Sequence, residues 1–168
     1  MMEWEHKMSY DCCIEKDKNW FRYRTGGILI RDGKMLFVKS KIGGYYYMIG
    51  GGVHMGERSD ICIEREIYEE TGMEAKVDRL SVVCENFFKC IGGVIDGYDC
   101  HTIELYYYMK ITGSADLCKP CTDDGEELVW VPLEEIADAD IKPSFMKDLI
   151  DRILTQEQVI HVIQETDR

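Results

Sequence analysis

The chain of 168 residues is long enough for one domain with a sizeable core and too short for two comfortable ones. Hydrophobic residues make up 45% of it and charged residues 31%, which is ordinary for a globular protein. The formal net charge is −12, from 20 basic and 32 acidic side chains, and this disfavours a long nucleic acid as a partner. A small anionic substrate stays compatible with the charge if metal ions neutralise its site.

The N-terminal stretch "MMEWEHKMSYDCC" alternates charged and apolar residues and lacks the apolar core of a secretory signal. No apolar run has the length needed to span a bilayer. We therefore expect a cytoplasmic protein whose eight cysteines are mostly reduced thiols. Cys118 and Cys121 have CxxC spacing, but the chain has no second CxxC to complete a zinc site, so loop thiols are favoured over zinc.

The first half of the chain predicts an extension, a hairpin and a helix. Residues 1–20 show no clear period and are expected to form an N-terminal extension that includes at most a short helix. Strands are expected at 22–31 and 34–40, joined by a turn at Asp32-Gly33. A glycine-punctuated loop, "KIGGYYYMIGGG", then leads to a helix over 59–71. Ser59 is the expected N-cap of this helix, and Gly72 follows its last residue.

The second half predicts further strands and two helices. Strands are expected at 76–90 and 101–112, followed by the polar loop "CKPCTDDGEE" and a short strand "LVWV". One helix is expected over "PLEEIADA", beginning at Pro132, and an amphipathic helix from Pro143. The tail "EQVIHVIQETDR" is β-branched and has weak strand character. This order predicts an α/β (α+β) fold with a mixed sheet covered by helices, a domain over 21–155 and a tail over 156–168 that joins the domain or a dimer interface.

Three acidic side chains of the 59–71 helix are expected to share one face. At 100° per residue, Glu69 and Glu70 lie about 60° and 40° to either side of Glu66. Carboxylates at this spacing repel each other, so the face is either solvated or occupied by a cation. Grouped hard oxygen ligands suit Mg²⁺, or Mn²⁺ as a substitute, with substrate phosphates and water in the remaining positions. The glycines at 50–52 let the backbone approach a bulky anionic ligand closely.

The whole stretch from 51 to 73 fits one defined pattern, G-x5-E-x7-R-E-U-x-E-E-x-G-U, in which U is a bulky aliphatic residue. A chance match in a chain of this composition has a probability of about 10⁻⁶. The stretch resembles the Nudix box, filled here by Gly51, Glu57, Arg65, Glu66, Ile67, Glu69, Glu70, Gly72 and Met73. The later "ELVWVPLEEI" is similar to the W-x-P-L-x-E-L segment of the same family. One departure is Gly50, where family members usually carry proline before the paired glycines; this is expected to leave the turn freer.

The resemblance implies an α/β/α sandwich with a central mixed β-sheet and a hydrolase that cleaves the diphosphate of a nucleoside diphosphate linked to another group. Glu66, Glu69 and Glu70 would hold one to three Mg²⁺ ions, which neutralise charge on the phosphoryl oxygens and lower the pKa of a water. That water would attack one phosphorus and expel the other phosphate. Arg65 would point to a different side of the helix from Glu69 and Glu70 and orient the loop through an ion pair with Glu57.

The general base is less closely defined by the resemblance. Glu66 is one candidate, but a carboxylate bound to metal is a poor base. Many family members supply a carboxylate from a late loop, which in this chain is "TDDGEEL". Glu126 is favoured there because it lies just before the strand that ends near Trp130, and the other candidates are Asp123, Asp124 and Glu127.

Substrate contacts are expected from the backbone of Gly51 and Gly52, from Lys39 near phosphate, and from Tyr47 and Phe88 against a base or sugar. Arg22, Arg24 and Lys41 are further basic residues within possible reach of phosphate. The substrate is expected to be a nucleotide sugar, a nucleoside triphosphate or a similar small molecule. Subfamily signatures are missing: for example, no proline occurs between Gly72 and Pro120.

Other readings of the same residues stay open. A Nudix-fold module that senses a nucleotide without cutting it is one, although such domains usually lose box carboxylates. An isoprenoid-diphosphate isomerase on a related fold is another, although the intact box argues against it. RNA decapping is disfavoured by the net charge. A homodimer is compatible with the sequence.

Overall fold

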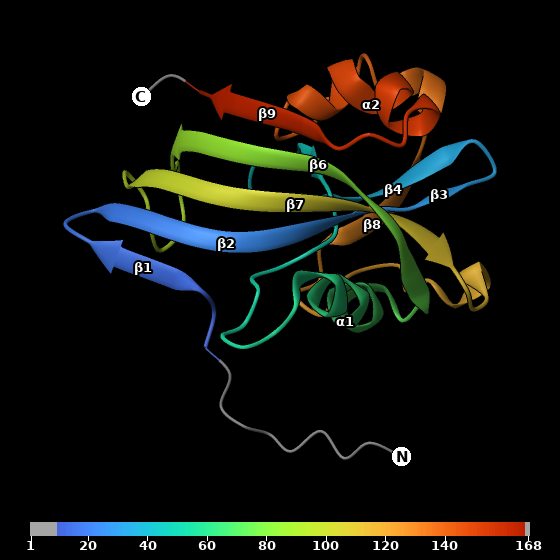
Figure 1. Ribbon diagram of the computed structural model, residues 1–168, viewed down its shortest axis with the longest axis horizontal. Helices are drawn as coiled ribbons and strands as arrows, with labels where there is room; N and C mark the ends of the chain where they lie inside the picture. The colour runs from blue at the N-terminus through green and yellow to red at the C-terminus, as the bar shows by residue number, and fades with distance from the viewer. Residues whose placement is uncertain (1–9, 167–168) are drawn as a thin grey trace.

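The computed structural model describes residues 10–166, and β-strands make up most of its regular structure (Figure 1). Two long strands, β6 and β7, pair antiparallel along nearly their whole length at the centre of the fold. In chain order the elements are β1 (Cys13–Lys16), β2 (Asn19–Ile28), β3 (Ile30–Arg31), β4 (Lys34–Lys39), β5 (Tyr46–Tyr47), α1 (Ser59–Thr71), β6 (Ala75–Lys89), β7 (Asp99–Ile111), the 3₁₀ turn η1 (Ala115–Leu117), β8 (Glu127–Pro132), the 3₁₀ turn η2 (Leu133–Glu135), α2 (Phe145–Thr155) and β9 (Ile160–Glu165).

The strands form two sheets. The five-stranded sheet has the order β1-β2-β7-β6-β9, in which β2 is parallel to β7 and β9 is parallel to β6, while the other neighbours are antiparallel. The four-stranded sheet is built on β4, which pairs with β3, β5 and β8. Parallel and antiparallel pairs therefore occur together, and the predicted mixed sheet is confirmed.

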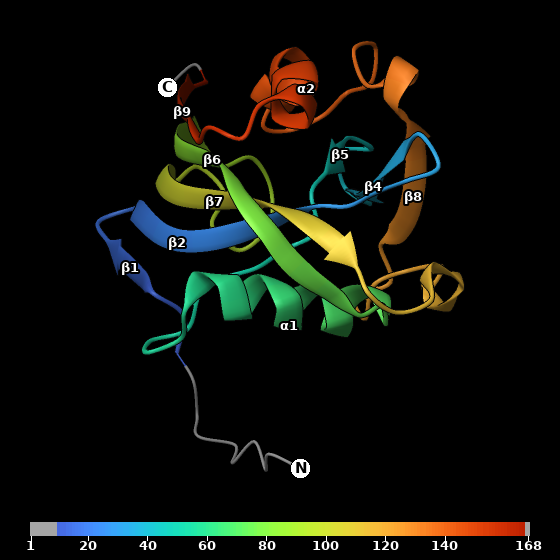
Figure 2. The same ribbon diagram turned by 45° about the vertical axis from the view of Figure 1, so that its right-hand side comes forward.

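The two α-helices lie on opposite sides of the strands (Figures 1 and 2). Ile63 and Ile67 of α1 are fully buried in one hydrophobic core, together with Leu36 of β4. Phe145 and Met146 of α2 are buried in a second core on the other side of the five-stranded sheet. Each helix thus buries its apolar stripe against a sheet, and the expected α/β/α sandwich is confirmed.

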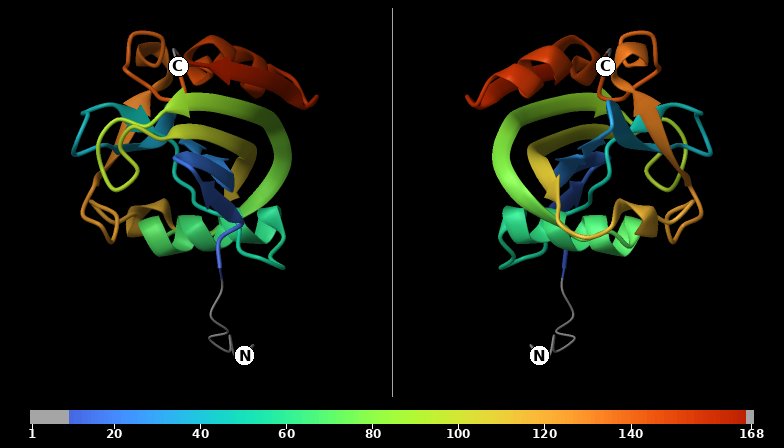
Figure 3. Two further views of the ribbon diagram at one scale, coloured as in Figure 1. Left: turned by 90° about the vertical axis from the view of Figure 1, so that its left-hand side faces the viewer. Right: turned by 90° about the vertical axis from the view of Figure 1, so that its right-hand side faces the viewer.

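Strand β6 curves strongly, as both views of Figure 3 show. Its pairing with β7 shifts register between Val77 and Arg79, and again between Leu80 and Val82. Such β-bulges bend a strand and increase its twist. The curve carries β6 from the end of α1 to the side of α2, where it pairs with β9.

The early strands differ from the expected ones in their sheet membership. The predicted strand 22–31 is two strands: β2 pairs with β7, whereas β3 pairs with β4 in the other sheet. The chain changes sheet at Leu29, whose side chain is fully buried. The turn at Asp32-Gly33 is confirmed, with φ values of 51° and 72° that suit a tight hairpin. Residues 10–20 contain strand β1 and no helix, while residues 1–9 of the expected extension lie outside the described residues.

The helix ends and the later elements also test the expectations. Helix α1 spans the predicted residues, and the residue after it, Gly72, has the expected left-handed conformation. The predicted N-cap is wrong, because Arg58 occupies that position. Ser59 instead shares a 2.7 Å hydrogen bond with the hydroxyl of Tyr107. The helix expected from Pro132 is only the 3₁₀ turn η2, because the chain extends again to pair with Tyr46. The tail forms β9, as its β-branched pattern indicated.

The helices of residues 10–166 include none that is long and apolar enough to cross a bilayer. Strands β1 and β9, which lie at the two ends of the described chain, both belong to the five-stranded sheet. A division of the chain at residues 20 and 155 stays a prediction.

Candidate functional site

The glycine-rich loop before α1 is bound along the edge of β2. The backbone N–H of Thr25 donates to the carbonyl of Gly51 at 2.9 Å, and that of Gly27 donates to Ile49 at 2.8 Å. Gly27 also allows the helix to approach the sheet, since a Cβ there would lie 3.0 Å from the Cδ1 of Ile67. The loop and the helix that follows it are therefore fixed against β2 by backbone bonds and close packing.

Gly50 and Gly51 are required by close approaches in this loop. Gly50 has a φ of 154°, and a Cβ there would collide with the carbonyl oxygen of Thr25. Proline holds φ near −65°, so it cannot adopt this conformation, and Gly50 is not simply a freer version of the expected turn. At Gly51 a Cβ would collide with the carboxylate of Glu66, which therefore lies directly against the loop backbone.

Arg65 joins three carboxylates. Its Nε and Nη2 donate to the two carboxylate oxygens of Glu57 at 2.8 and 3.0 Å, and its Nη1 donates to Glu66 at 2.7 Å and to Glu69 at 2.9 Å. The expectation that Arg65 points away from Glu69 is wrong, because residues four apart are neighbours on a helix. Hydrogen bonds to Glu57, partly opposed by burial, raise the pKa of Arg65.

Glu57 is held as a carboxylate by these contacts. Burial alone would raise its pKa, but the hydrogen bonds from Arg65 and from the backbone N–H of His54, which lies 3.1 Å away, lower it below its ordinary value. The box loop is therefore connected to the middle of α1 by a half-buried, bidentate ion pair, the strongest common form of this contact.

The carboxylates of α1 face the acidic loop at 121–127. Burial, followed by repulsion from Glu66, Asp124, Asp123 and Glu126, raises the pKa of Glu70. Lys119 connects this loop to the helix, because its Nζ donates to the carbonyl of Glu69 at 2.9 Å and to Asp123 at 3.0 Å. Five carboxylates from two segments thus lie close enough to repel one another.

This cluster fits a divalent cation by its chemistry. Within residues 10–166 no three His, Cys, Asp or Glu side chains are arranged as a finished metal cage, and Arg65 occupies one oxygen each of Glu66 and Glu69. Glu70 accepts no hydrogen bond from any described residue, so both of its oxygens are available. Hard oxygen donors with uncompensated negative charge are what Mg²⁺ and Mn²⁺ bind.

Glu126 is fixed by two neighbours from the early loop. The hydroxyl of Tyr47 donates to its Oε2, and the backbone N–H of Lys41 donates to its Oε1 at 3.1 Å. The ammonium group of Lys41 also donates to the carbonyl of Asp124 at 2.7 Å. Burial and then the hydrogen bond to Glu126 raise the pKa of Tyr47 above its ordinary value, so its hydroxyl stays protonated and donates.

Comparison with known proteins identifies the family. A family model described as the NUDIX domain matches residues 20–153, which is most of the chain. This chain belongs to the NUDIX family. A MutT-like protein from Streptomyces ambofaciens is 33% identical over 63 residues, a match that covers 37% of this chain and only 41% of that relative.

Solved structures share the Nudix fold at low identity. A mutator MutT protein from Bacillus halodurans has a TM-score of 0.66 and 16% identity, over 86% of this chain and 89% of that one. A structure described as a UDP-X diphosphatase has a TM-score of 0.55 and 18% identity, over 83% of this chain and 66% of that one. The fold of this chain is therefore that of the Nudix pyrophosphohydrolases.

Three predicted substrate contacts, Gly52, Lys39 and Phe88, make no hydrogen bond to a carboxylate of the cluster within residues 10–166. Gly52 packs against the 3.0 Å ion pair of Asp11 and Arg22. Lys39 is exposed at the end of β4, and its ammonium group contacts no acceptor within residues 10–166. Phe88 lines a hollow at the ends of β1, β2, β6 and β7.

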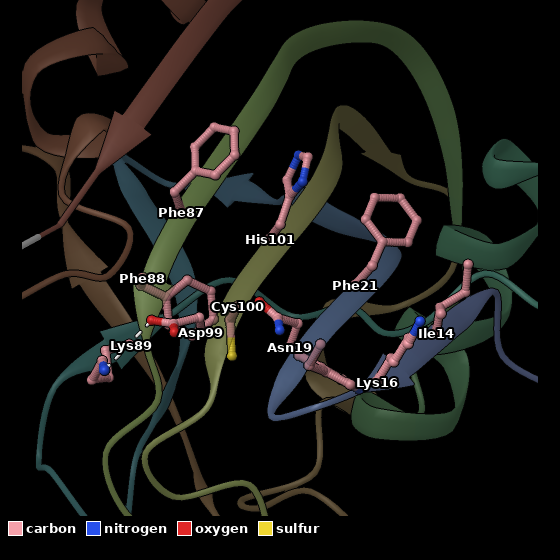
Figure 4. Close-up of a pocket in the computed structure, with 11 residues that line it drawn as sticks. Ile14, Lys16, Asn19, Phe21, Phe87, Phe88, Lys89, Asp99, Cys100 and His101 are labelled. Atoms are coloured by element: carbon pink, nitrogen blue, oxygen red, sulfur yellow. Dashed lines mark ion pairs between the residues drawn. The ribbon is translucent and has the colours of Figure 1, made fainter. Parts of the chain in front are cut away.

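The hollow is open and has a volume of about 670 Å³ (Figure 4). On one side Phe87 stacks on His101 with ring centroids 4.3 Å apart, and Phe21 meets the same imidazole edge-on at 5.4 Å. In Figure 4, Phe88 points to the other side of β6 from Phe87. None of the Nudix-box carboxylates lines this hollow, so it is separate from the candidate active site.

Lys119 and Glu104 were not predicted from the sequence. Lys119 lies between Cys118 and Cys121, and nothing in its position in the sequence predicted a contact with α1. Glu104 is 3% exposed in the middle of β7, opposite Arg24 of β2. A charged residue within the otherwise apolar and aromatic run "TIELYYYM" was the available signal, because a buried carboxylate needs partners.

Proposed function

We propose that this Nudix protein is a divalent-cation-dependent pyrophosphohydrolase that cleaves the diphosphate of a small nucleoside diphosphate linked to a second group. The observation that carries the proposal is the gathering of carboxylates from α1 and from the 121–127 loop beside a glycine turn that has no side chains. Unbalanced negative charge of this kind is costly unless a cation binds there.

Glu66, Glu69 and Glu70 are the residues that would hold Mg²⁺, with Mn²⁺ as a substitute. A cation bound there supplies charge neutralisation for the diphosphate and a lowered pKa for the attacking water. Arg65 orients Glu66 and Glu69 and, through Glu57, fixes the loop from which the backbone of Gly51 faces the substrate.

Glu126 is the proposed general base. Its two oxygens each accept one hydrogen bond, from Tyr47 and Lys41, and a carboxylate has further lone pairs that can accept a proton. The water oxygen forms a bond to one phosphorus while Glu126 takes its proton. The bond from that phosphorus to the bridging oxygen breaks, and the departing phosphate keeps the electron pair.

The structure gives Tyr47 a different contact from the one expected. Its hydroxyl is engaged with Glu126, so it acts as a positioning residue for the base. Phe88 and Lys39 stay predictions for substrate binding. A cytoplasmic location and a homodimer are likewise predictions from the sequence.

A substrate panel tests the proposal. The purified protein would be incubated with Mg²⁺ and nucleotide sugars, dinucleotides, nucleoside triphosphates, ADP-ribose, NADH or coenzyme A, and products would be followed by ³¹P NMR. We expect turnover of one or two members, with loss of turnover in Glu126→Gln and not in the exposed neighbour variant Glu127→Gln. Binding without turnover across the panel would contradict hydrolysis and favour a nucleotide-sensing module.

A further inference from the structure

Arg24 of β2 is a half-buried cation whose guanidinium group makes no hydrogen bond within residues 10–166. No described residue accepts a hydrogen bond or forms an ion pair with its guanidinium group, although this group carries five N–H donors. Burial opposes its charge, but the fields of four neighbours outweigh this and raise its pKa. In order of effect these neighbours are Glu104, Tyr106, Tyr47 and Glu66.

Glu104 balances the charge of Arg24 without using its donors. The Oε1 of Glu104 accepts from the hydroxyl of Thr102 at 2.6 Å and from the amide of Asn86 at 3.3 Å, and its Oε2 accepts from Tyr106. The carboxylate is thus satisfied by other residues. A half-buried guanidinium group with no hydrogen bond to a described residue has its donors free for a ligand.

Asn86 adds an acceptor that lacks a donor. Its side chain is 8% exposed, its Nδ2 is engaged by Glu104, and its Oδ1 is buried with no hydrogen-bond partner among the described residues. Unfilled donors on Arg24 and an unfilled acceptor on Asn86 therefore flank one carboxylate.

These groups share one face of the five-stranded sheet. Arg24 is paired with Glu104 across β2 and β7, and Asn86 is paired with Thr102 across β6 and β7. Residues paired across strands, and residues two apart along one strand, point to the same face. Arg24 also forms an isolated antiparallel bridge with Gly52, next to Gly51 on which the Glu66 carboxylate packs, so this polar cluster lies beside the glycine loop of the candidate site.

We propose that Arg24 and Asn86 bind the nucleobase of the substrate, and that they select a base edge with a carbonyl next to a ring N–H, as in guanine and uracil. Since Glu104 already neutralises Arg24, this polar cluster favours a neutral acceptor over another phosphate. The carbonyl accepts from the guanidinium fork and the N–H donates to Asn86 Oδ1. This inference rests on the proposed function, because it assumes a nucleotide substrate.

Binding of nucleoside monophosphates to the full chain without metal tests the roles of Arg24 and Asn86 separately from catalysis. Calorimetric titrations would use GMP, UMP, AMP, CMP and ribose 5-phosphate, none of which contains a diphosphate to cleave. We expect GMP or UMP to bind at least about tenfold more tightly than AMP, CMP and ribose 5-phosphate. Arg24→Met and Asn86→Leu should each remove this preference, whereas Arg31→Met, at an arginine paired with Asp116, should keep it.

Three outcomes would overturn the inference. Equal affinities of the wild-type protein for all four monophosphates would show that Arg24 and Asn86 do not select a base edge. A loss of ribose 5-phosphate affinity in Arg24→Met as large as the loss for GMP would place Arg24 on phosphate. A preference for AMP or CMP would reverse the donor and acceptor assignment.

A double variant guards against misfolding. Arg24→Met alone leaves Glu104 as an unpaired buried charge, so Arg24→Met/Glu104→Gln removes both charges together. The double variant should keep the wild-type circular dichroism spectrum and bind the four monophosphates equally. Base preference that survives in this folded variant would contradict the inference, whereas failure of the hydrolysis panel with base preference intact would contradict only the proposed reaction.

Discussion

The contact between Tyr47 and Glu126 positions the carboxylate that we propose as the general base. Glu126 lies in a loop with several acidic side chains, and only Glu126 among them accepts hydrogen bonds from both Tyr47 and the backbone of Lys41. A carboxylate held at both oxygens is confined to one orientation, which a proton acceptor requires. Its neighbours Asp123 and Asp124 are exposed, and Asp123 is paired with Lys119.

Replacement of Tyr47 by phenylalanine should therefore slow the chemical step. Loss of one hydrogen bond to a charged group predicts about a tenfold fall in kcat, with KM unchanged because the substrate itself loses no contact. Steady-state kinetics on the substrate found in the panel would measure the split. Tyr45→Phe is the matched control, and a rise in KM alone for Tyr47→Phe would place Tyr47 against the substrate.

The ion pair of Glu57 with Arg65 predicts a pH dependence of stability. The folded-state pKa of Glu57 lies below its ordinary value of 4.5, so its contribution is fully present above that pH and is lost as the pH falls through the folded-state pKa. At neutral pH, Glu57→Gln should lower the free energy of unfolding by about 2 kcal/mol. Urea unfolding at several pH values should show the difference from wild type shrinking below pH 4.5. A difference that stays constant down to acid pH, or that equals the effect of the exposed control Glu127→Gln, would contradict the assignment.

Local sequence pattern predicted most individual elements but not how the sheets divide them. Helix α1 had clear signals, from buried Ile63 and Ile67 to the terminal Gly72, and it occupies the expected residues. The run 22–31 is continuous in its β-propensity, and only the tertiary pairing of β3 with β4 splits it from β2. The box carboxylates could be read from one helix, whereas Tyr47 and Glu126 meet only because β4 pairs with both β5 and β8.

Strand β9 offers a test of how far the sheet extends toward the C-terminus. Ile160 is 7% exposed and pairs with Val82 of β6, while Ile163 on the same strand is 63% exposed. Ile160→Ala should lower the free energy of unfolding by about 2–4 kcal/mol, because it removes buried methyl groups from the α2-side core. Ile163→Ala should change it by less than about 0.5 kcal/mol. Equal effects of the two variants in urea unfolding would mean that β9 does not pack as described.

The whole molecule brings together three segments that are far apart in the sequence. The loop before β5, the box helix α1 and the loop before β8 are joined by hydrogen bonds, and the acidic side chains of α1 and of the loop before β8 repel one another there. A chain with a net charge of −12 gains nothing from this concentration of negative charge unless a cation and an anionic ligand share the site. This concentration of negative charge supports the proposed binding of a divalent cation together with an anionic substrate.

The most direct test of this account is the Mg²⁺ dependence of turnover in Glu70→Gln. Burial, followed by repulsion from four acidic neighbours, raises the pKa of Glu70, and no described residue donates a hydrogen bond to it, so a bound cation is its expected partner. We predict that Glu70→Gln lowers kcat/KM about 100-fold or more and raises the Mg²⁺ concentration needed for half-maximal rate, while the exposed control Glu74→Gln does neither. Wild-type rates and an unchanged Mg²⁺ requirement in Glu70→Gln would contradict the assignment of the acidic cluster as the metal site.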